Sequence, residues 1–204
     1  MISVRTKLYF SMENLILQQF FVFTFSERHD KMCSYLYFSF LRGQTMDSNF
    51  FALISRMRYI ARWGLMRNAL PENIQEHSHQ VAVLAHALAV IRNRCFGGQV
   101  DPGTVAVAAL YHDASEILTG DLPTPIKYYN PAIRDAYKQV EHIACGKLVG
   151  MLPPELQPDF AEALTPTDPE VEELVKAADK LSAYIKCVEE QKAGNNEFCA
   201  AAQQ

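Results

Sequence analysis

A histidine and an aspartate stand side by side in an apolar stretch of the chain. His112 and Asp113 follow the segment Val105-Ala-Val-Ala-Ala-Leu-Tyr111, which predicts a helix with a buried face. Two ionisable side chains are costly in such surroundings unless a partner satisfies them. An imidazole beside a carboxylate suits a divalent cation that accepts nitrogen and oxygen ligands. If the dipeptide stood alone, a buried histidine satisfied by a neighbour, with Asp113 exposed, would be the preferred interpretation.

Two further side chains of metal-ligand type interrupt apolar helix faces. His77 lies at the N-terminal end of a stripe that continues through Val81, Leu84, Leu88 and Ile91 at helical spacing, and Asp179 follows Val175 by four residues in a later helix. Independent core residues could produce this pattern by chance, but a shared ion explains all the burials at once. The sequence therefore predicts a divalent-metal site, and its ligands are His77, His112, Asp113 and Asp179.

Glu116 is the candidate for proton transfer at this site. It lies four residues after His112 and three after Asp113, so all three side chains share one face of the predicted helix. A carboxylate in that position can exchange a proton with water or with a leaving group. The alternative is an ordinary surface carboxylate, and the face shared with the His-Asp pair favours the catalytic interpretation.

The segments that would position these residues are helical. Periodic apolar residues and capping signals predict helices over about 48–62, 75–94, 103–118, 131–148, 155–163 and 169–193. Pro123 and Pro125 make the stretch 121–125 an extended connection rather than helix interior. Strand alternation and internal repeats are both lacking, so the expected fold class is all-α, a helical bundle around the metal site.

Composition narrows the class of partners. The formal net charge of −4 argues against a duplex nucleic-acid binder, which needs a concentrated basic face. Five cysteines without a C-x-x-C pair indicate reduced thiols in a cytoplasmic protein. The nearest candidate for a span, residues 15–25, is short and interrupted by Gln18 and Gln19. It is followed by a charged cluster rather than a cleavage site. We therefore expect neither a membrane span nor a signal peptide.

Several short motifs together resemble one family. From residue 49 to the C-terminus the chain resembles the HD-domain superfamily of metal-dependent phosphohydrolases, and within it the bacterial 5′-deoxynucleotidases, which hydrolyse deoxyribonucleoside 5′-monophosphates. Each motif alone is weak, but the set is specific. The motifs are Arg62-Trp63-x-Leu-Met-Arg-Asn68, Glu76-His77-Ser78, Tyr111-His-Asp-Ala-Ser-Glu116, Thr119-Gly-Asp-Leu-Pro-Thr-Pro125 and Ala193-Gly-Asn-Asn-Glu197.

The resemblance implies roles for individual residues. Glu116 matches the catalytic acid/base, and Arg62 matches a residue that both contacts the substrate and assists catalysis. It also implies one divalent ion (cobalt, manganese or copper), a small deoxynucleotide substrate and a homodimer. Substrate contacts are implied for Arg62, Trp63, His77, Asp113, Asp121, Leu122, Pro123, Thr124 and Asp179.

The two ends of the chain depart from the family pattern. Residues 1–45 have no counterpart, and Met46 would be a natural start, so we expect an extension that is poorly ordered or a misplaced start. The family normally continues beyond Gln204, so we expect the domain over 46–204 to be truncated at its C-terminus. Part of the helical shell or the dimer surface would then be missing.

Two other functions remain open from the sequence. Another HD phosphohydrolase, such as a cyclic-nucleotide phosphodiesterase or a guanosine tetraphosphate hydrolase, would share the metal ligands. The Arg62-Trp63 pair and the 121–125 connection argue against it. A non-catalytic helical module that keeps the metal for stability is a different kind of answer, and the intact Glu116 argues against that one.

Overall fold

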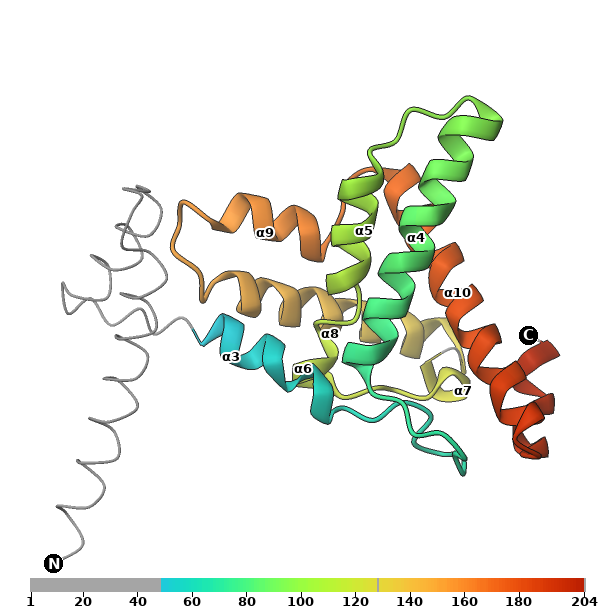
Figure 1. The fold of residues 1–204 in the computed structure, drawn as a ribbon. Coiled ribbons are helices and arrows are strands. Elements are labelled where there is room, and N and C mark those ends of the chain that lie inside the picture. Colours follow the sequence, from blue (N-terminus) through green and yellow to red (C-terminus); the bar gives the residue numbers. More distant parts are fainter. Residues whose placement is uncertain (1–48, 128, 204) are drawn as a thin grey trace, which may run out of the picture. The chain divides into compact units, whose positions relative to one another are not determined.

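Three helices form the centre of the structure, a computed structural model that describes residues 49–127 and 129–203. They are α4 (Ile74–Phe96), α5 (Pro102–Tyr111) and α10 (Pro169–Lys192). In Figure 1, α5 runs back along α4, and α10 descends along the other side of α4. Because α5 is antiparallel to α4, the end of α5 lies near the start of α4.

Small side chains line the contacts between these helices. Ala85, Ala89 and Ala109 are fully buried, as are Val81 and Val105. Short side chains allow helix axes to approach closely, since interaxial distance depends on the residues at the contact. Each fully buried valine contributes ~1.5–3 kcal/mol relative to exposure. This close packing holds the three helices in fixed register.

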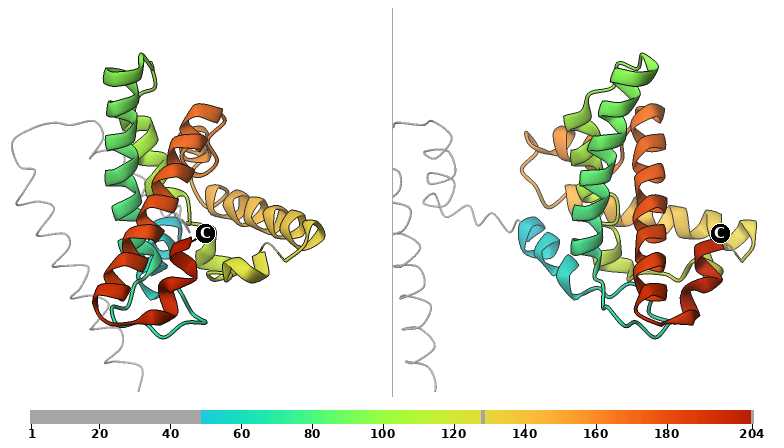
Figure 2. Two further views of the ribbon diagram at one scale, coloured as in Figure 1. Left: turned by 90° about the vertical axis from the view of Figure 1, so that its right-hand side faces the viewer. Right: turned by 45° about the vertical axis from the view of Figure 1, so that its right-hand side comes forward.

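A second apolar cluster joins three further helices. It is formed by α3 (Phe50–Ile54), α8 (Pro131–Val149) and α9 (Gln157–Leu164). Phe50 is fully buried and meets the ring of Phe160 edge-on at 5.2 Å. Figures 1 and 2 show α8 lying across the direction of α4 and α10. The cluster also includes Ala114, from the turn that follows α5. Because Ala114 directly follows His112 and Asp113, this packing fixes the turn that carries the pair.

The connections contain short helices. These are η1 (Ser55–Tyr59), α6 (Glu116–Thr119), α7 (Thr124–Lys127), η2 (Asn196–Cys199) and η3 (Ala201–Gln203). Within residues 49–127 and 129–203 no strand is formed, and Ala61 and Asn73 make an isolated antiparallel bridge. The all-α prediction is confirmed.

Side-chain caps explain where the long helices begin. The carboxylate of Asp101 accepts from the N–H groups of Gly103 and Thr104, and that of Asp168 accepts from Glu170. Asn73 caps α4 in the same way. These acceptors satisfy N–H groups that lack a partner within the helix. Gly97, at φ 72°, ends α4 in the left-handed conformation that favours glycine, so the predicted stop at 97–98 is confirmed.

The predicted helix over 48–62 is wrong in its second half. Helix α3 ends at Ile54, η1 follows, and Ile60 is extended. Ser55 Oγ donates to the Phe51 carbonyl at 2.9 Å, and Arg58 Nε donates to the Ser55 carbonyl at 2.9 Å. Such local side-chain bonds compete with regular helix bonding. The predicted cap, Ser48, lies outside the described residues.

The predicted helix over 103–118 is also interrupted. It ends at Tyr111, and residues 112–115 form a turn before α6. The ring of His112 bonds to the Ala109 carbonyl at 2.7 Å, and the N–H groups of Ala114 and Glu116 bond three residues back. His112 and Asp113 therefore lie in a tight turn rather than inside a helix. The expected extended stretch 121–125 likewise ends early, because α7 begins at Thr124 and tolerates Pro125 in its first turn.

The apolar stripe predicted for α4 is confirmed at its start and fails at its end. His77 and Val81 are fully buried and Leu84 and Leu88 pack against the core, but Ile91 is 47% exposed. The buried face of α4 continues instead through Ala82, Ala85 and Ala89. On α10 the apolar face that Asp179 interrupts is buried at Val171, Leu174, Val175, Ala178 and Ser182.

The expectations for residues 1–45 fall outside the described residues. In the part of the chain that is described, no helix is both long and apolar enough to cross a membrane. Cys95, Cys145, Cys187 and Cys199 are all free thiols.

Candidate metal centre

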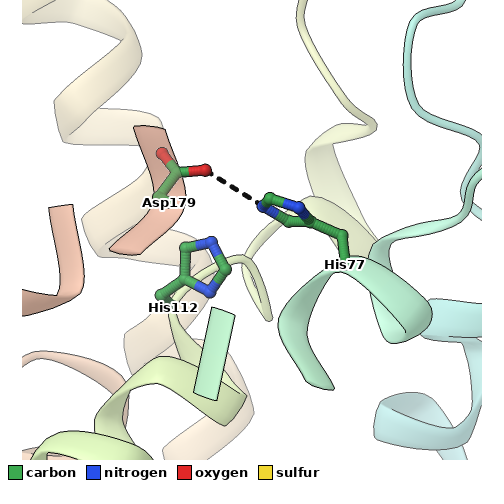
Figure 3. Close-up of side chains that lie close together, drawn as sticks. All are labelled: His77, His112 and Asp179. Carbon is green, nitrogen blue, oxygen red and sulfur yellow. Dashed lines mark hydrogen bonds and ion pairs between the residues drawn. The ribbon is translucent and has the colours of Figure 1, made fainter. Parts of the chain in front are cut away.

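Three side chains from separate parts of the chain converge at one point. His77 lies in the first turn of α4, His112 directly follows α5, and Asp179 lies midway along α10. One ligand atom from each lies within 4.8 Å of the others, and Figure 3 shows the three groups pointing toward one another. The antiparallel pairing of α4 and α5 brings the two histidines together, and α10 supplies the carboxylate.

The ring of His112 is held in a defined orientation. Its Nδ1 lies 2.7 Å from the Ala109 carbonyl. Because a carbonyl can only accept, Nδ1 must carry the hydrogen. In the neutral ring Nε2 then has a free lone pair. Nε2 is buried and makes no well-aligned hydrogen bond to a described residue, although Asp113 Oδ2 lies 3.1 Å away. This is the arrangement expected of a nitrogen and an oxygen that bind the same ion.

His77 is fully buried and is oriented by a second network. Its Nε2 lies 3.0 Å from Asp179 Oδ1, and its Nδ1 lies 3.2 Å from Ser182 Oγ. Ser182 Oγ donates to Gln80 Oε1 at 2.7 Å, so the hydroxyl accepts from Nδ1. Nδ1 therefore carries a hydrogen, and Nε2 faces the centre of the cluster. Fixing the outer nitrogen in this way is typical of metal-binding histidines.

Asp113 stands beside the three converging groups. Its Oδ2 lies 3.1 Å from His112 Nε2 and 3.6 Å from His77 Nε2, and it accepts from Arg62 Nη1 at 3.2 Å. Burial raises the pKa of Asp113, but His112 and Arg62 lower it further, and the net pKa lies well below the usual range. Asp113 is therefore an anion next to both histidines. Its carboxylate is placed to be the fourth ligand of the ion.

Glu116 is buried, with one unsatisfied oxygen. It is 5% exposed, and its Oε2 has no hydrogen-bond partner among the described residues. Burial, followed by the Asp113 and Asp121 carboxylates, raises its pKa to about 9. In the metal-free protein this carboxyl group therefore keeps its proton at neutral pH, and a protonated carboxyl can serve as an acid.

The donor set fits a divalent ion. Two imidazole nitrogens and the carboxylates of Asp113 and Asp179 suit zinc and the first-row transition metals. Unprotonated Nε2 of His112 and Asp113 Oδ2, two acceptors 3.1 Å apart, would share the ion. With two anionic ligands and a dication the site is formally neutral, so a phosphate group is not repelled.

Arg62 and Trp63 lie next to the cluster on an unusual stretch of backbone. Arg62 Nε and Trp63 Nε1 both donate to Glu72 Oε2, at 3.1 Å and 2.8 Å. Trp63 has φ 61°, the one positive φ of a non-glycine residue in the described chain. Its ring lies against Phe198 at 5.2 Å. The predicted pair is thus held at the edge of the site, with Arg62 bound to Asp113.

The predicted substrate segment 121–124 lies partly in this region. Burial, opposed by Arg62 and supported by Asp113, raises the pKa of Asp121, so Asp121 belongs to the same electrostatic environment. Leu122 and Pro123 are half-buried. Thr124 is exposed and makes no hydrogen bond to the cluster within the described part of the chain. The structure brings Asp121 to the site and leaves Thr124 at its periphery.

Glu190 is a residue of this region that the sequence reasoning missed. It is fully buried on α10 and accepts from the N–H groups of Ala69 and Leu70 at 2.8 and 2.9 Å, and from Asn195 Nδ2 at 2.7 Å. It also pairs with Lys186. These bonds attach the loop that carries Trp63 to α10. The i, i+4 spacing of Lys186 and Glu190 was the available signal, but ordinary surface pairs share this spacing, and the burial follows only from the tertiary structure.

Comparisons with known proteins identify the family of the chain. A family model described as "5′-deoxynucleotidase YfbR-like" matches residues 49–204. The chain belongs to this family. Among its relatives, a 5′-deoxynucleotidase of Vibrio parahaemolyticus is 54% identical over 76% of this chain and 81% of that protein. The 5′-deoxynucleotidase YfbR of Shigella boydii is 56% identical over 76% and 79%.

Solved structures agree on the fold. An HD-domain phosphohydrolase of Listeria innocua superposes with a TM-score of 0.67 at 24% identity, covering 76% of this chain and 75% of that one. The HD phosphohydrolase DatZ of cyanophage S-2L, described as bound to dA and one catalytic Zn²⁺ ion, gives 0.51 at 28% identity over 67% and 69%. The family, the HD fold and the 5′-deoxynucleotidase activity expected of a YfbR-like chain are confirmed.

Proposed function

We propose that the site hydrolyses deoxyribonucleoside 5′-monophosphates to deoxyribonucleoside and phosphate with one divalent ion held by His77, His112, Asp113 and Asp179. The convergence of His77, His112 and Asp179, with an unsatisfied Nε2 on His112, carries the proposal. The 54–57% identical 5′-deoxynucleotidases support the substrate class. The single catalytic Zn²⁺ named for DatZ supports one ion.

The ion and the protein residues would divide the chemistry. A bound divalent cation withdraws charge from the phosphate and makes water more acidic. Arg62 keeps donors beyond those bound to Glu72 and Asp113, and these can contact phosphate oxygens. His77 and His112 present unprotonated Nε2 atoms to the ion. We assign Asp121 and Trp63 to contacts with the sugar.

Glu116 would handle the proton. Hydrolysis forms a bond between the phosphorus and a water oxygen and breaks the bond to the 5′-oxygen, which must be protonated as it departs. Glu116, protonated at neutral pH, donates that proton. The attacking water releases a proton that restores the carboxyl group, so the cycle closes without another reactant.

Activity assays on chelated protein test the proposal. After chelation and add-back of cobalt, manganese, copper or zinc, phosphate release should appear with deoxyribonucleoside monophosphates and be much weaker with ribonucleotides. Glu116→Ala should lose about 10²–10⁴-fold in kcat while still binding the ion. Loss of metal binding in His112→Ala but not in His86→Ala, an exposed histidine of α4, provides the matched control. Full activity in the chelated protein would sink the proposal.

Three further proposals concern the oligomeric state, the cellular compartment and the identity of the ion. We propose that the chain forms a homodimer and acts in the cytoplasm, with cobalt, manganese or copper as the working ion. Val140 and Ile143 on α8 are 48% and 56% exposed, which supports an apolar contact surface. The free thiols support a reducing compartment. Light scattering after gel filtration tests the dimer, and a monomer mass at micromolar concentration would refute it.

A further inference from the structure

Glu72 is a largely buried carboxylate, and none of the sequence motifs gives it a role. Its side chain is 11% exposed and is paired with Arg62, whose side chain is 13% exposed. A charge withdrawn this far from water needs both a partner and hydrogen bonds. One oxygen, Oε2, accepts from Arg62 Nε at 3.1 Å and from Trp63 Nε1 at 2.8 Å. A single atom thus binds two neighbouring side chains.

The backbone around Glu72 reinforces this connection. The N–H of Arg62 donates to the Glu72 carbonyl at 3.0 Å, and Ala61 bridges to Asn73. Trp63 adopts φ 61°, a conformation that a side chain with a Cβ rarely adopts without support. The hydrogen bond to Glu72 and the ring contact with Phe198 supply that support.

The contacts of Arg62 show what Glu72 does for the guanidinium group. Nε is bound to Glu72 and Nη1 to Asp113. Two anchors fix the plane of the group, since its donors are arranged in a rigid fork. No bond to Nη2 is formed within the described part of the chain, so that nitrogen keeps its donors for phosphate oxygens. The guanidinium carbon lies 5.9 Å from the centre of the Trp63 ring, so the two side chains that share Glu72 Oε2 are also neighbours.

We propose that Glu72 is a positioning residue that sets Arg62 and Trp63 in one fixed relation to the His-Asp cluster, so that phosphate and sugar recognition are coupled through its Oε2. The inference rests on the proposed function for the roles of Arg62 and Trp63. In this proposal Glu72 acts through Arg62 and Trp63 and not on the substrate. Its other oxygen, Oε1, lies 3.9 Å from His77 Nδ1, a nitrogen that Ser182 holds at 3.2 Å. Removing the charge of Glu72 should therefore loosen both substrate contacts at once and leave the metal ligands in place.

Trp63 is the only tryptophan of the chain, so its fluorescence reports directly on this interaction. In Glu72→Gln a neutral amide oxygen takes the place of Oε2 and accepts both bonds more weakly than the charged carboxylate does. We expect a red-shifted emission, more efficient acrylamide quenching, and unchanged uptake of cobalt by the apoprotein. Glu173→Gln removes the same charge from an exposed position on α10 and should leave the spectrum unchanged. An unaltered Trp63 spectrum in Glu72→Gln would overturn the proposal.

Kinetic constants separate phosphate recognition by Arg62 from sugar recognition by Trp63. In Glu72→Gln, KM for a deoxynucleoside monophosphate and Ki for inorganic phosphate should both rise about tenfold, a change of about 1.4 kcal/mol, and kcat should fall much less. Trp63→Phe keeps a ring against Phe198 but lacks the N–H. It should weaken deoxyribose discrimination and leave Ki for phosphate unchanged. Equal Ki values in wild type and Glu72→Gln would count against the proposal.

The fluorescence result also distinguishes two kinds of failure. If the wild-type protein hydrolysed no nucleotide, the proposed function would fall, yet the response of Trp63 to Glu72→Gln would still decide whether Glu72 holds the pair. If Glu72→Gln does not fold, Trp63→Phe carries the test. In that case unchanged discrimination in the folded phenylalanine variant overturns the coupling.

Discussion

The hydroxyl of Ser182 lies 3.2 Å from Nδ1 of His77, although 105 residues separate them in the chain. Ser182 donates its own hydrogen to Gln80, so it accepts the hydrogen of the ring. The opposite nitrogen, 3.0 Å from Asp179 Oδ1, is thereby directed toward the proposed ion site. A small side chain on α10 thus decides how a ligand on α4 presents itself.

Ser182→Ala should weaken metal binding without removing a ligand. Loss of an outer partner typically lowers metal affinity about 10–100-fold, and kcat at saturating metal should change little. The affinity is measured by titrating the apoprotein with cobalt in a calorimeter. Ser78→Ala is the matched control, because Ser78 is equally buried but its Oγ has no hydrogen-bond partner among the described residues. Equal affinities for the two variants would contradict the prediction.

Glu116 should make the metal-free protein less stable as the pH rises. Its pKa is raised from 4.5 to about 9 in the folded state, so between these values the folded protein holds a proton that the unfolded chain releases. Stability therefore falls with increasing pH in this window, by at most about 1.4 kcal/mol per pH unit. Glu116→Gln should show a flatter profile in chemical denaturation from pH 5 to 9. A wild-type profile without this decline would refute the assignment.

Glu190 should have the opposite pH dependence. Although burial raises the pKa of Glu190, hydrogen bonds from Lys186, Ala69, Leu70 and Asn195 lower it to about 2, from 4.5. The stabilisation is fully present above 4.5 and is lost as the pH falls toward 2.

Replacement of Glu190 tests this directly. Glu190→Gln should be less stable than wild type at neutral pH and lose little more on acidification. Glu189→Gln, at the exposed neighbouring position, should keep the wild-type acid transition. The transition is followed by circular dichroism. If the acid transition of Glu190→Gln matches that of wild type, another group is responsible.

Packing between the ligand-bearing helices should control the geometry of the site. Ala85 on α4 is fully buried in the cluster that joins α4, α5 and α10. Ala85→Leu should destabilise the protein by about 1–3 kcal/mol through overpacking and also weaken metal binding, because it pushes the helices apart. Ala87→Leu makes the same change at an exposed site of α4 and should do neither. Thermal melts with and without metal measure both effects.

The sequence by itself determined which elements are helical and which side chains could bind an ion. Capping residues and apolar periodicity mark α4, α8 and α10 almost to the residue, because these are local preferences. His77 and Asp179 were recognisable because an ionisable group on an apolar face demands a partner. The turn at His112 was not foreseen, because it depends on a ring nitrogen competing for a backbone carbonyl.

Only the tertiary structure decided how those side chains are used. The orientation of His77 depends on Ser182 and Gln80, the anchoring of Arg62 on Asp113 and Glu72, and the raised pKa of Glu116 on its burial beside two carboxylates. These relations join residues that lie far apart in the chain. They arise from how closely α4, α5 and α10 approach, a distance that no local pattern encodes.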